Sequence, residues 1–429
     1  MKKIVALLMA LCMVFALCAC GESAAPAATE APAADAPAAD APAADAPAMK
    51  VGFIFLHDEN STYDLNFMNA AKEACANLGF SEEQFIFRTN IPEGQECYDA
   101  ACELADAGCT VIFADSFGHE DYMIQAAKEF PEVQFCHATG TKAHTEGLDN
   151  FHNAFASIYE GRYLAGVAAG LKLNEMIEAG QFTADEAKIG YVGAYTYAEV
   201  VSGYTSFFLG ARSVCPTAPM EVTFTGSWYD ETVEKEAANK LIANGCKLIS
   251  QHADSMGAPT ACETAGVPNV SYNGSTEAAC PNTFIVSSRI NWAPYYEYVI
   301  NAVLAGEAVD ADWTGTLATE SVLLTDVNEK AAAAGTADAI ADAKAKLESG
   351  ELNVFDTATF TVSGDNLNDN IKVDADGHVT SYMADVDTDA AYTGDTEVVE
   401  NGVFQESKFR SAPYFDLKID GITLLDTAF

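Results

Sequence analysis

From residue 49 onward, the chain alternates short apolar runs with stretches that have helical spacing. The run over residues 50–56 is continuous and apolar, which is typical of a buried parallel strand, and a helix-like stretch follows over 63–78. The cycle continues with strands expected over 84–87, 109–114 and 133–137, and helices over 95–107 and 120–130. This alternation predicts right-handed βαβ units in a doubly wound parallel sheet, an α/β fold.

A polar break over residues 139–150 separates this set from a second one, which begins with a long helix expected over 157–173. Further strands are expected over 188–194, 220–224, 247–251 and 268–272, and helices over 199–214 and 231–243. Two similar sets predict two lobes. In open α/β sheets the ligand binds beyond the carboxyl ends of the strands, so each turn after a strand is a candidate site loop.

The tail over residues 363–429 has a different composition. It is rich in Asp, Gly, Thr and Val, it alternates over 371–383, and 403–422 also has β-like composition. We expect a β-rich C-terminal appendage that covers one lobe.

The first 20 residues have the features of an export signal. Lys2 and Lys3 precede an apolar run that is too short to be a confident membrane span, and the run ends in Leu17-Cys18-Ala19-Cys20. These four residues resemble a bacterial lipobox, which implies lipidation of Cys20 and a cell-membrane, extracytoplasmic location. An ordinary signal peptide cut nearby, with Cys20 incidental, is the alternative.

Residues 21–48 have the composition of a tether. Ala-Pro-Ala-Ala-Asp repeats three times, and Thr29 is the one β-branched residue, so the segment cannot bury enough apolar surface to fold. At roughly 3.1 Å per residue, an extended Pro-rich chain of this length reaches on the order of 80 Å. We therefore expect residues 49–429 to be held off a membrane on a stalk.

The charge of the chain limits its partners. The formal net charge is −41, which argues against nucleic acid as a partner and against a strongly anionic ligand. A neutral small molecule is the better expectation.

The cysteine pattern does not indicate a metal or cofactor site. Nine Cys remain after the signal region, no Cys-x-x-Cys pair occurs, and the seven His are scattered. We interpret the Cys as buried small hydrophobic residues, although bridges between Cys97 and Cys102 or between Cys262 and Cys280 remain open.

The turn after the first strand, residues 57–67, carries the richest set of polar groups. Ser61 or Thr62 can cap the helix that follows, and Tyr63, Asp64 and Asn66 offer a ring, a carboxylate and an amide. Simple capping with Tyr63 packed in the core is the alternative.

Three later turns also follow expected strands. Ser116 and Phe117 lie in the first, the aromatic pair Trp228-Tyr229 precedes Asp230 in the second, and Asn273 lies in the third. A Trp at such a position can stack on a flat ligand. None of these turns contains a nucleophile elbow, a Walker loop or a zinc-protease motif, so binding without chemistry fits better.

Several segments in series resemble the basic membrane protein family of ABC-transporter binding lipoproteins. The similar segments are 113–118, 130–135, 159–170, 188–194, 208–214, 226–230 and 291–296, and together they cover about residues 50–310. The resemblance implies a type I periplasmic-binding-protein fold and a purine nucleoside or base as ligand. With this fold, residues 49–150 and 287–312 form lobe I, and residues 151–286 and 313–362 form lobe II.

The resemblance also implies roles for individual residues. Tyr63 and Trp228 fall on the two stacking rings, and Asp64 falls where the family has an amide, which favours a ligand edge with N–H donors such as adenine. Asn273 and Ile290 replace an acid and a base that bind ribose, which puts sugar recognition in doubt. Ser116, Phe117, Asn66 and Asp230 complete the expected site.

The function expected from these features is ligand delivery to the permease subunits of an ABC importer, with the membrane reached through the lipid anchor. Two alternatives remain. One is a sensor lipoprotein that presents the closed form to a receptor, and the other is an exported nucleoside hydrolase.

Overall fold

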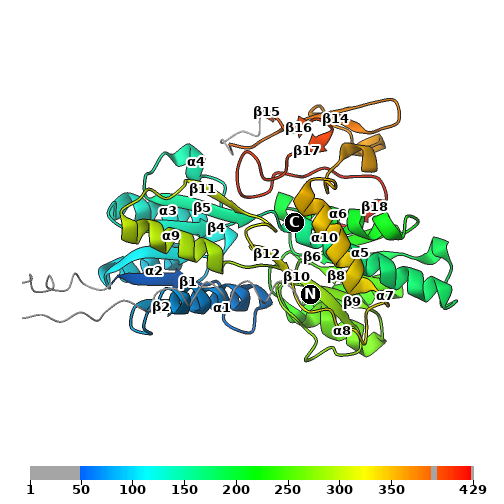
Figure 1. The fold of residues 1–429 in the computed structure, drawn as a ribbon, viewed down its shortest axis with the longest axis horizontal. Coiled ribbons are helices and arrows are strands. Elements are labelled where there is room, and N and C mark those ends of the chain that lie inside the picture. The colour runs from blue at the N-terminus through cyan, green and yellow to red at the C-terminus, as the bar shows by residue number, and fades with distance from the viewer. Residues whose placement is uncertain (1–48, 388–393, 427–429) are drawn as a thin grey trace, which may run out of the picture. The chain divides into compact units, whose positions relative to one another are not determined.

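The computed structural model describes residues 49–387 and 394–426. Cys20, the expected signal peptide and the expected tether lie outside the described residues. The described part contains two large sheets flanked by helices, together with two small sheets in the tail (Figure 1).

The first sheet is parallel throughout and runs in the order β11-β5-β4-β3-β1-β2. Its strands are β1 (Lys50–Ile54), β2 (Phe85–Arg88), β3 (Cys109–Ala114), β4 (Gln134–Ala138), β5 (Phe151–Ala156) and β11 (Asp312–Gly315). Its helices are α1 (Thr62–Asn77), α2 (Gln95–Asp106), α3 (Glu120–Glu129), α4 (Ala143–Glu146) and α9 (Ala293–Ala305). We call these elements lobe I.

Side chains alternate across this sheet because successive strand residues point to opposite faces. Phe53 belongs to the core cluster that includes residues of α1 and α9, whereas Ile54 belongs to the cluster beneath α2 and α3. Burial of both faces explains why the β1 run is continuous in its apolar character rather than alternating.

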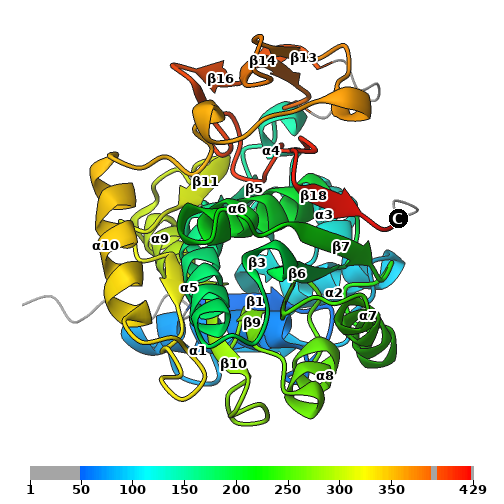
Figure 2. The same cartoon turned by 90° about the vertical axis from the view of Figure 1, so that its right-hand side faces the viewer.

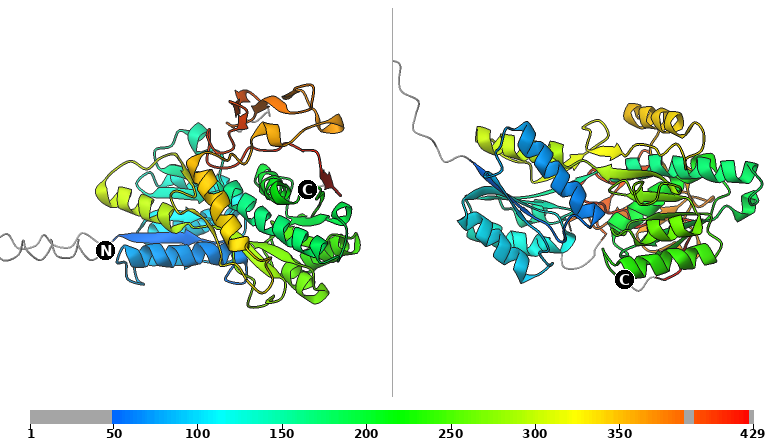
Figure 3. Two further views of the ribbon diagram at one scale, coloured as in Figure 1. Left: turned by 45° about the vertical axis from the view of Figure 1, so that its right-hand side comes forward. Right: turned by 90° about the horizontal axis from the view of Figure 1, so that it is seen from below.

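The second sheet runs in the order β12-β10-β9-β8-β6-β7-β18, and only the β10–β12 pair is antiparallel. Its strands are β6 (Ile189–Gly193), β7 (Met220–Phe224), β8 (Leu248–Gln251), β9 (Asn269–Tyr272), β10 (Phe284–Ile290), β12 (Val322–Leu324) and β18 (Ile422–Leu424). Its helices are α5 (Ile158–Glu178), α6 (Ala198–Val214), α7 (Glu231–Ala243), α8 (Gly257–Ala265) and α10 (Thr336–Ser349). We call these elements lobe II, and Figure 3 shows its helices on both sides of the sheet.

The two lobes share one strand order, since β2-β1-β3-β4-β5 in lobe I corresponds to β7-β6-β8-β9-β10 in lobe II. Later parts of the chain add β11 to lobe I, and β12 and β18 to lobe II. A turn after a strand of lobe I therefore has a topological equivalent in lobe II.

Helices α5 and α6 lie side by side in lobe II (Figure 2). Their glycines permit this contact, because a Cβ added at Gly166 would lie 2.1 Å from the Phe207 carbonyl oxygen and one at Gly210 would lie 2.0 Å from that of Tyr163. The small residues over 161–170 thus serve helix packing.

The observed lobe boundaries differ from the expected ones. Residues 151–156 and 313–315 were expected in lobe II but belong to β5 and β11 of lobe I, and residues 287–290, expected in lobe I, belong to β10 of lobe II. The sequence pattern did not indicate β5 as a strand because His152 and Asn153 are polar, although both are buried. The Nε2 of His152 lies 2.7 Å from Gln134 Oε1.

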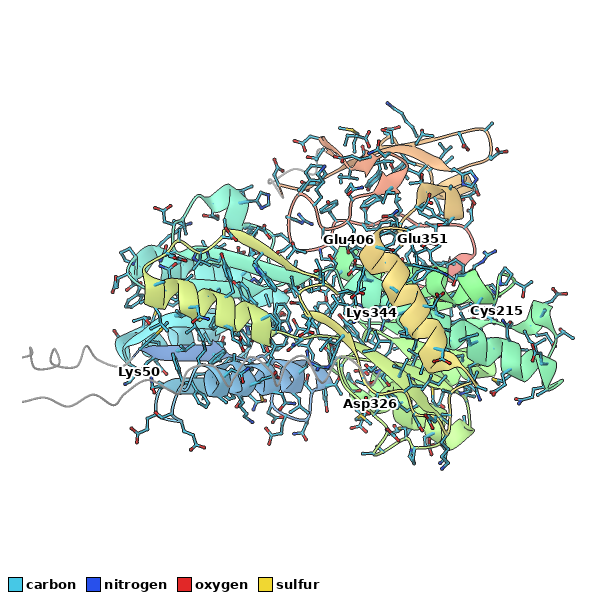
Figure 4. The ribbon with its side chains drawn as sticks, in the orientation of Figure 1. Lys50, Cys215, Asp326, Lys344, Glu351 and Glu406 are labelled. Atoms are coloured by element: carbon cyan, nitrogen blue, oxygen red, sulfur yellow. The ribbon has the colours of Figure 1, made fainter. Side chains whose placement is uncertain are left out.

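The tail contains a small sheet of β13 (Ile371–Val373), β14 (Val379–Ala384) and β15 (Thr396–Glu397), and a hairpin of β16 (Val399–Glu400) and β17 (Val403–Phe404). The expectation for 403–422 was wrong for most of its length, because residues 405–421 form no strand. The appendage contacts both lobes: Ser202 of α6 donates to Glu406 Oε1 at 2.5 Å, and the Ser411 N–H donates to Asp312 Oδ1 at 2.6 Å. Figure 4 labels Glu406 near the end of α10.

The nine described cysteines are free thiols, and all except Cys102 are buried. Neither Cys97 with Cys102 nor Cys262 with Cys280 forms a disulfide. Among the described residues, no helix combines the length and apolar character needed to cross a membrane.

Candidate functional site

A small cavity of about 20 Å³ lies where strand ends of the two lobes face each other. A space of this size holds about one water molecule, so a larger ligand requires the lobes to open. Lobe I contributes Leu56, His57, Tyr63, Ser116, Phe117 and Thr139, and lobe II contributes Glu199, Trp228, His252, Asp254 and Tyr272. The cavity thus occupies the place that an open α/β sheet favours, at the carboxyl ends of both sets of strands.

The two lobes touch around this cavity. Thr62 donates from its backbone N–H and from its hydroxyl to the Asp254 carbonyl oxygen, at 3.2 and 2.9 Å. The rings of Phe117 and Tyr197 have centroids 5.1 Å apart, and those of His57 and Tyr229 are 5.4 Å apart. These contacts join the lobes directly, so the arrangement is a closed one.

Four of the predicted site residues line the cavity: Tyr63, Ser116, Phe117 and Trp228. The Tyr63 hydroxyl donates to the Asp115 carbonyl oxygen at 2.6 Å, which fixes the ring at the start of α1. The Ser116 hydroxyl donates to Glu93 Oε1 at 2.6 Å, so its oxygen remains able to accept a further hydrogen bond.

The other four predicted residues lie outside the lining. Asp64 is fully buried, and its Oδ1 accepts from the His57 N–H at 2.7 Å. Asn66 donates to the Ile290 carbonyl oxygen at 2.6 Å, across the lobes. Each of these two side chains already has a hydrogen-bond partner within the protein.

The side chains of Asp230 and Asn273 are also hydrogen-bonded within the protein. Asp230 caps α7, where its Oδ1 accepts from the backbone N–H groups of Thr232 and Val233 at 3.1 and 3.0 Å. Asn273 is buried and donates to Asp254 Oδ1 at 3.4 Å. Helix capping and loop support use the same residue types as ligand binding, so sequence alone cannot separate the two uses.

Asp254 and Glu199 are the carboxylates of the lining, and the sequence prediction did not include them. Asp254 lies in the turn after β8, so the expectation that site residues follow strand ends applies to it, although it was not among the predicted residues. Glu199 lies in the first turn of α6, and its Oε1 is 3.3 Å from His252 Nε2. His252 Nδ1 is in turn 3.4 Å from the Tyr191 hydroxyl.

Burial raises the pKa of one acidic side chain in each lobe. In lobe II, burial and then the neighbouring Glu234 and Asp64 raise the pKa of Asp254 well above its ordinary value. In lobe I, burial and then Asp64 raise the pKa of Asp115 in the same way. Burial opposes ionisation of Asp64, but hydrogen bonds from His57 and Ser61 bring its pKa below the ordinary value.

No lysine or arginine belongs to the lining of this cavity within the described residues. Arg162 lies behind Tyr272, with its guanidinium carbon 4.7 Å from the ring centroid, and donates to the Gln251 carbonyl oxygen at 3.0 Å. The described part of the chain also contains no group of three or more His, Cys, Asp or Glu that is arranged to hold a metal ion.

The family model for PnrA-like ABC transporter substrate-binding proteins matches residues 54–354. The chain belongs to this family. It is therefore a solute-binding protein of an ABC transporter, which works on the extracytoplasmic side, and its partners are a small-molecule ligand and permease subunits.

Two relatives in sequence and one solved structure are similar to this binding protein. A purine-binding protein of Brucella abortus is 33% identical over 317 residues, which are 72% of this chain and 83% of that protein. A Haloferax volcanii protein whose name refers to glucose binding is 34% identical over 214 residues, 50% of this chain and 51% of that protein. An ABC transporter solute-binding protein from Aeropyrum pernix superposes with a TM-score of 0.60 at 17% identity and covers 74% of this chain and 94% of that one. This last likeness concerns the fold alone, and it confirms the expected two-lobed binding-protein fold.

Proposed function

We propose that this binding protein takes a purine-related ligand, with a free adenine-like base favoured over a nucleoside. The observation that carries the proposal is the lining of the cavity. It has aromatic rings from both lobes, Tyr63 and Trp228, together with carboxyl groups, and none of its described residues is a lysine or an arginine. The relationship to a purine-binding protein supports the same ligand class.

In this proposal, Tyr63 and Trp228 stack on the heterocycle. A carboxyl oxygen accepts hydrogen bonds, so the carboxyl groups of Asp254 and Glu199 can receive one from an exocyclic amine or a ring N–H. Phe117 and Ser116 complete the wall. Asp64, Asn66, Asp230 and Asn273 act on the ligand indirectly, by holding the loops that surround it.

The preference for a base rests on the two positions that the family resemblance assigns to sugar binding. Asn273 is engaged by Asp254, and Ile290 is a buried apolar side chain. Burying ribose hydroxyls without partners is costly. A flat base makes no such demand.

Side-by-side calorimetric titration of adenine, adenosine, inosine, guanosine and glucose tests this proposal. Adenine is expected to bind most tightly. A nucleoside that binds at least about tenfold more tightly than adenine would remove the preference for a base, and glucose binding without any purine binding would remove the ligand class.

We propose in addition that the protein is anchored to the membrane through lipidated Cys20, with residues 21–48 as the tether. The lipobox-like sequence before Cys20 supports this assignment. Cys20→Ser is expected to release the protein or leave it unprocessed, because stable attachment requires acyl chains. Detergent-phase partitioning equal to that of the wild type would contradict the anchor.

A further inference from the structure

Thr139 has an unusual backbone conformation at the wall of the cavity. It follows β4 directly, and its φ is +68°. This left-handed region is disfavoured for β-branched residues, which persist there only where the surroundings impose it. Outliers of this kind gather at functional sites.

The surroundings of Thr139 fix its backbone on both sides. Its N–H donates to the Ala154 carbonyl oxygen at 3.0 Å, which continues the β4–β5 ladder. The next residue, Gly140, is enclosed, since an added Cβ would lie 2.0 Å from Asn153 Nδ2. The Thr141 N–H then donates to Glu120 Oε1 at 2.7 Å. The turn is thus held by contacts that do not involve the Thr139 side chain.

The hydroxyl of Thr139 is buried and has no hydrogen-bond partner within the described residues. The residue is 3% exposed and lines the cavity. A buried hydroxyl without a partner is destabilising and uncommon, so it calls for a reason. A partner that arrives with the ligand supplies one.

Lobe II provides a matched position for comparison. Asn273 follows β9 as Thr139 follows β4, and its φ is +65°. Asn adopts this conformation readily, and its side chain donates to Asp254 Oδ1 at 3.4 Å. The equivalent loop therefore satisfies its side chain internally, whereas Thr139, which lines the cavity, has no partner for its hydroxyl within the described residues.

We infer that Thr139 is a specificity-determining residue whose hydroxyl donates a hydrogen bond to an unprotonated ring nitrogen of the ligand. This inference rests on the proposed purine site and deepens it. Asp254 and Glu199 in lobe II accept hydrogen bonds, so the ligand presents N–H groups to lobe II and an acceptor nitrogen to Thr139. A heterocycle that carries both features, as adenine does, is selected over one that carries only donors.

The test compares Thr139→Val with Thr139→Ser in the full-length protein. Val keeps the branched shape and removes the hydroxyl, whereas Ser keeps the hydroxyl. Adenine affinity is expected to fall between about fivefold and a hundredfold in Thr139→Val and to stay within about threefold in Thr139→Ser. The ligand-free melting temperature of Thr139→Val is expected to equal or exceed that of the wild type, because the unpaired hydroxyl is gone.

Deaza analogues of adenine identify the ring nitrogen involved. One analogue, which lacks the nitrogen that Thr139 contacts, is expected to bind the wild type and Thr139→Val equally weakly. The remaining analogues are expected to lose affinity in Thr139→Val as adenine does. Equal losses for every analogue would overturn the assignment, as would unchanged adenine affinity in Thr139→Val.

A second readout does not depend on the identity of the ligand. Mass spectrometry measures how much endogenous ligand co-purifies with each variant. Lower occupancy in Thr139→Val than in Thr139→Ser supports the role of Thr139, even if the ligand proves not to be a purine, in which case the proposed function alone is lost. Equal occupancy in both variants and the wild type overturns the inference.

Discussion

The two walls of the cavity come from lobes with the same strand order, yet their acidic side chains lie in different places relative to the cavity. In lobe I, Asp64 and Asp115 lie beneath the wall and accept from the backbone N–H groups of His57 and Leu56, at 2.7 and 3.1 Å. In lobe II, Asp254 and Glu199 belong to the lining itself. Topology places the loops, and the sequence of each loop decides whether its carboxyl group supports the backbone or lines the cavity.

This difference suggests how the ligand biases closure. Asp64 is one of the groups that raise the pKa of Asp254, so the closed arrangement brings acidic groups of the two lobes near one another. A ligand that contacts both walls makes all of its contacts only when the lobes are closed. Such a differential interaction is what a ligand needs to shift a hinge equilibrium.

The largest expected effect is the contrast between Asp254→Asn and Asp64→Asn. Asp254→Asn replaces one accepting carboxyl oxygen with an N–H2 donor, which leaves a ligand N–H unpaired at a cost of about 1–3 kcal/mol and should weaken adenine binding by about fivefold to a hundredfold. Asp64→Asn keeps the oxygen that accepts from His57 and should change affinity by less than about threefold. Calorimetry on both variants checks this, and a larger loss in Asp64→Asn than in Asp254→Asn would reverse the assignment of the two walls.

The second contrast concerns the aromatic groups. A stacked aromatic ring contributes about 1–3 kcal/mol per base, so Trp228→Ala should weaken adenine binding by roughly tenfold to a hundredfold. Trp228→Phe keeps a ring and should recover part of the loss. Tyr63→Phe keeps the ring of lobe I and should remain within about threefold of the wild type. Unchanged affinity and unchanged melting in Trp228→Ala would place this ring outside the binding site.

The last contrast is the pH dependence of stability, rather than of binding, in lobe II. Glu234 accepts from the Asp230 and Ser255 N–H groups at 3.1 and 3.2 Å, and burial raises its pKa from 4.5 to about 7. The folded state therefore prefers the protonated carboxyl, and the resulting stabilisation is complete below pH 4.5 and lost as the pH rises through about 7.

Glu234→Gln removes the cost of ionisation and should raise the free energy of unfolding at about pH 8, by up to about 3 kcal/mol, with little effect at about pH 4.5. Glu132→Gln, at an exposed site, is the matched control and should change neither. Denaturant unfolding at both pH values measures the difference. An equal gain at both pH values would show that Glu234 is not protonated preferentially in the folded state.

The alternation of apolar and helical segments predicted much of the fold because burial on both faces of a parallel sheet leaves a clear sequence pattern. The expected strand over 220–224 and helix over 231–243 coincide with β7 and α7. The pattern failed for β5, whose polar residues are satisfied by partners distant in sequence, and it gave no sign that β18 joins β7 from the end of the chain.

The candidate site was predictable as a set of loops but not residue by residue. The position of a turn follows from its strand, which is a local property. The direction of each side chain depends on which backbone donors the fold leaves unpaired: Asp64 meets the N–H of His57, and Asp230 meets those of α7. The sequence around Thr139 did not indicate a site residue, because its backbone conformation and its unpaired hydroxyl arise only in the folded chain.

The most direct test of the account is mass spectrometry of the small molecule released from the natively purified, full-length protein. The account predicts a purine, with the free base more abundant than any nucleoside, and a much lower amount from Asp254→Asn. A sugar or another non-aromatic compound as the released ligand would contradict it.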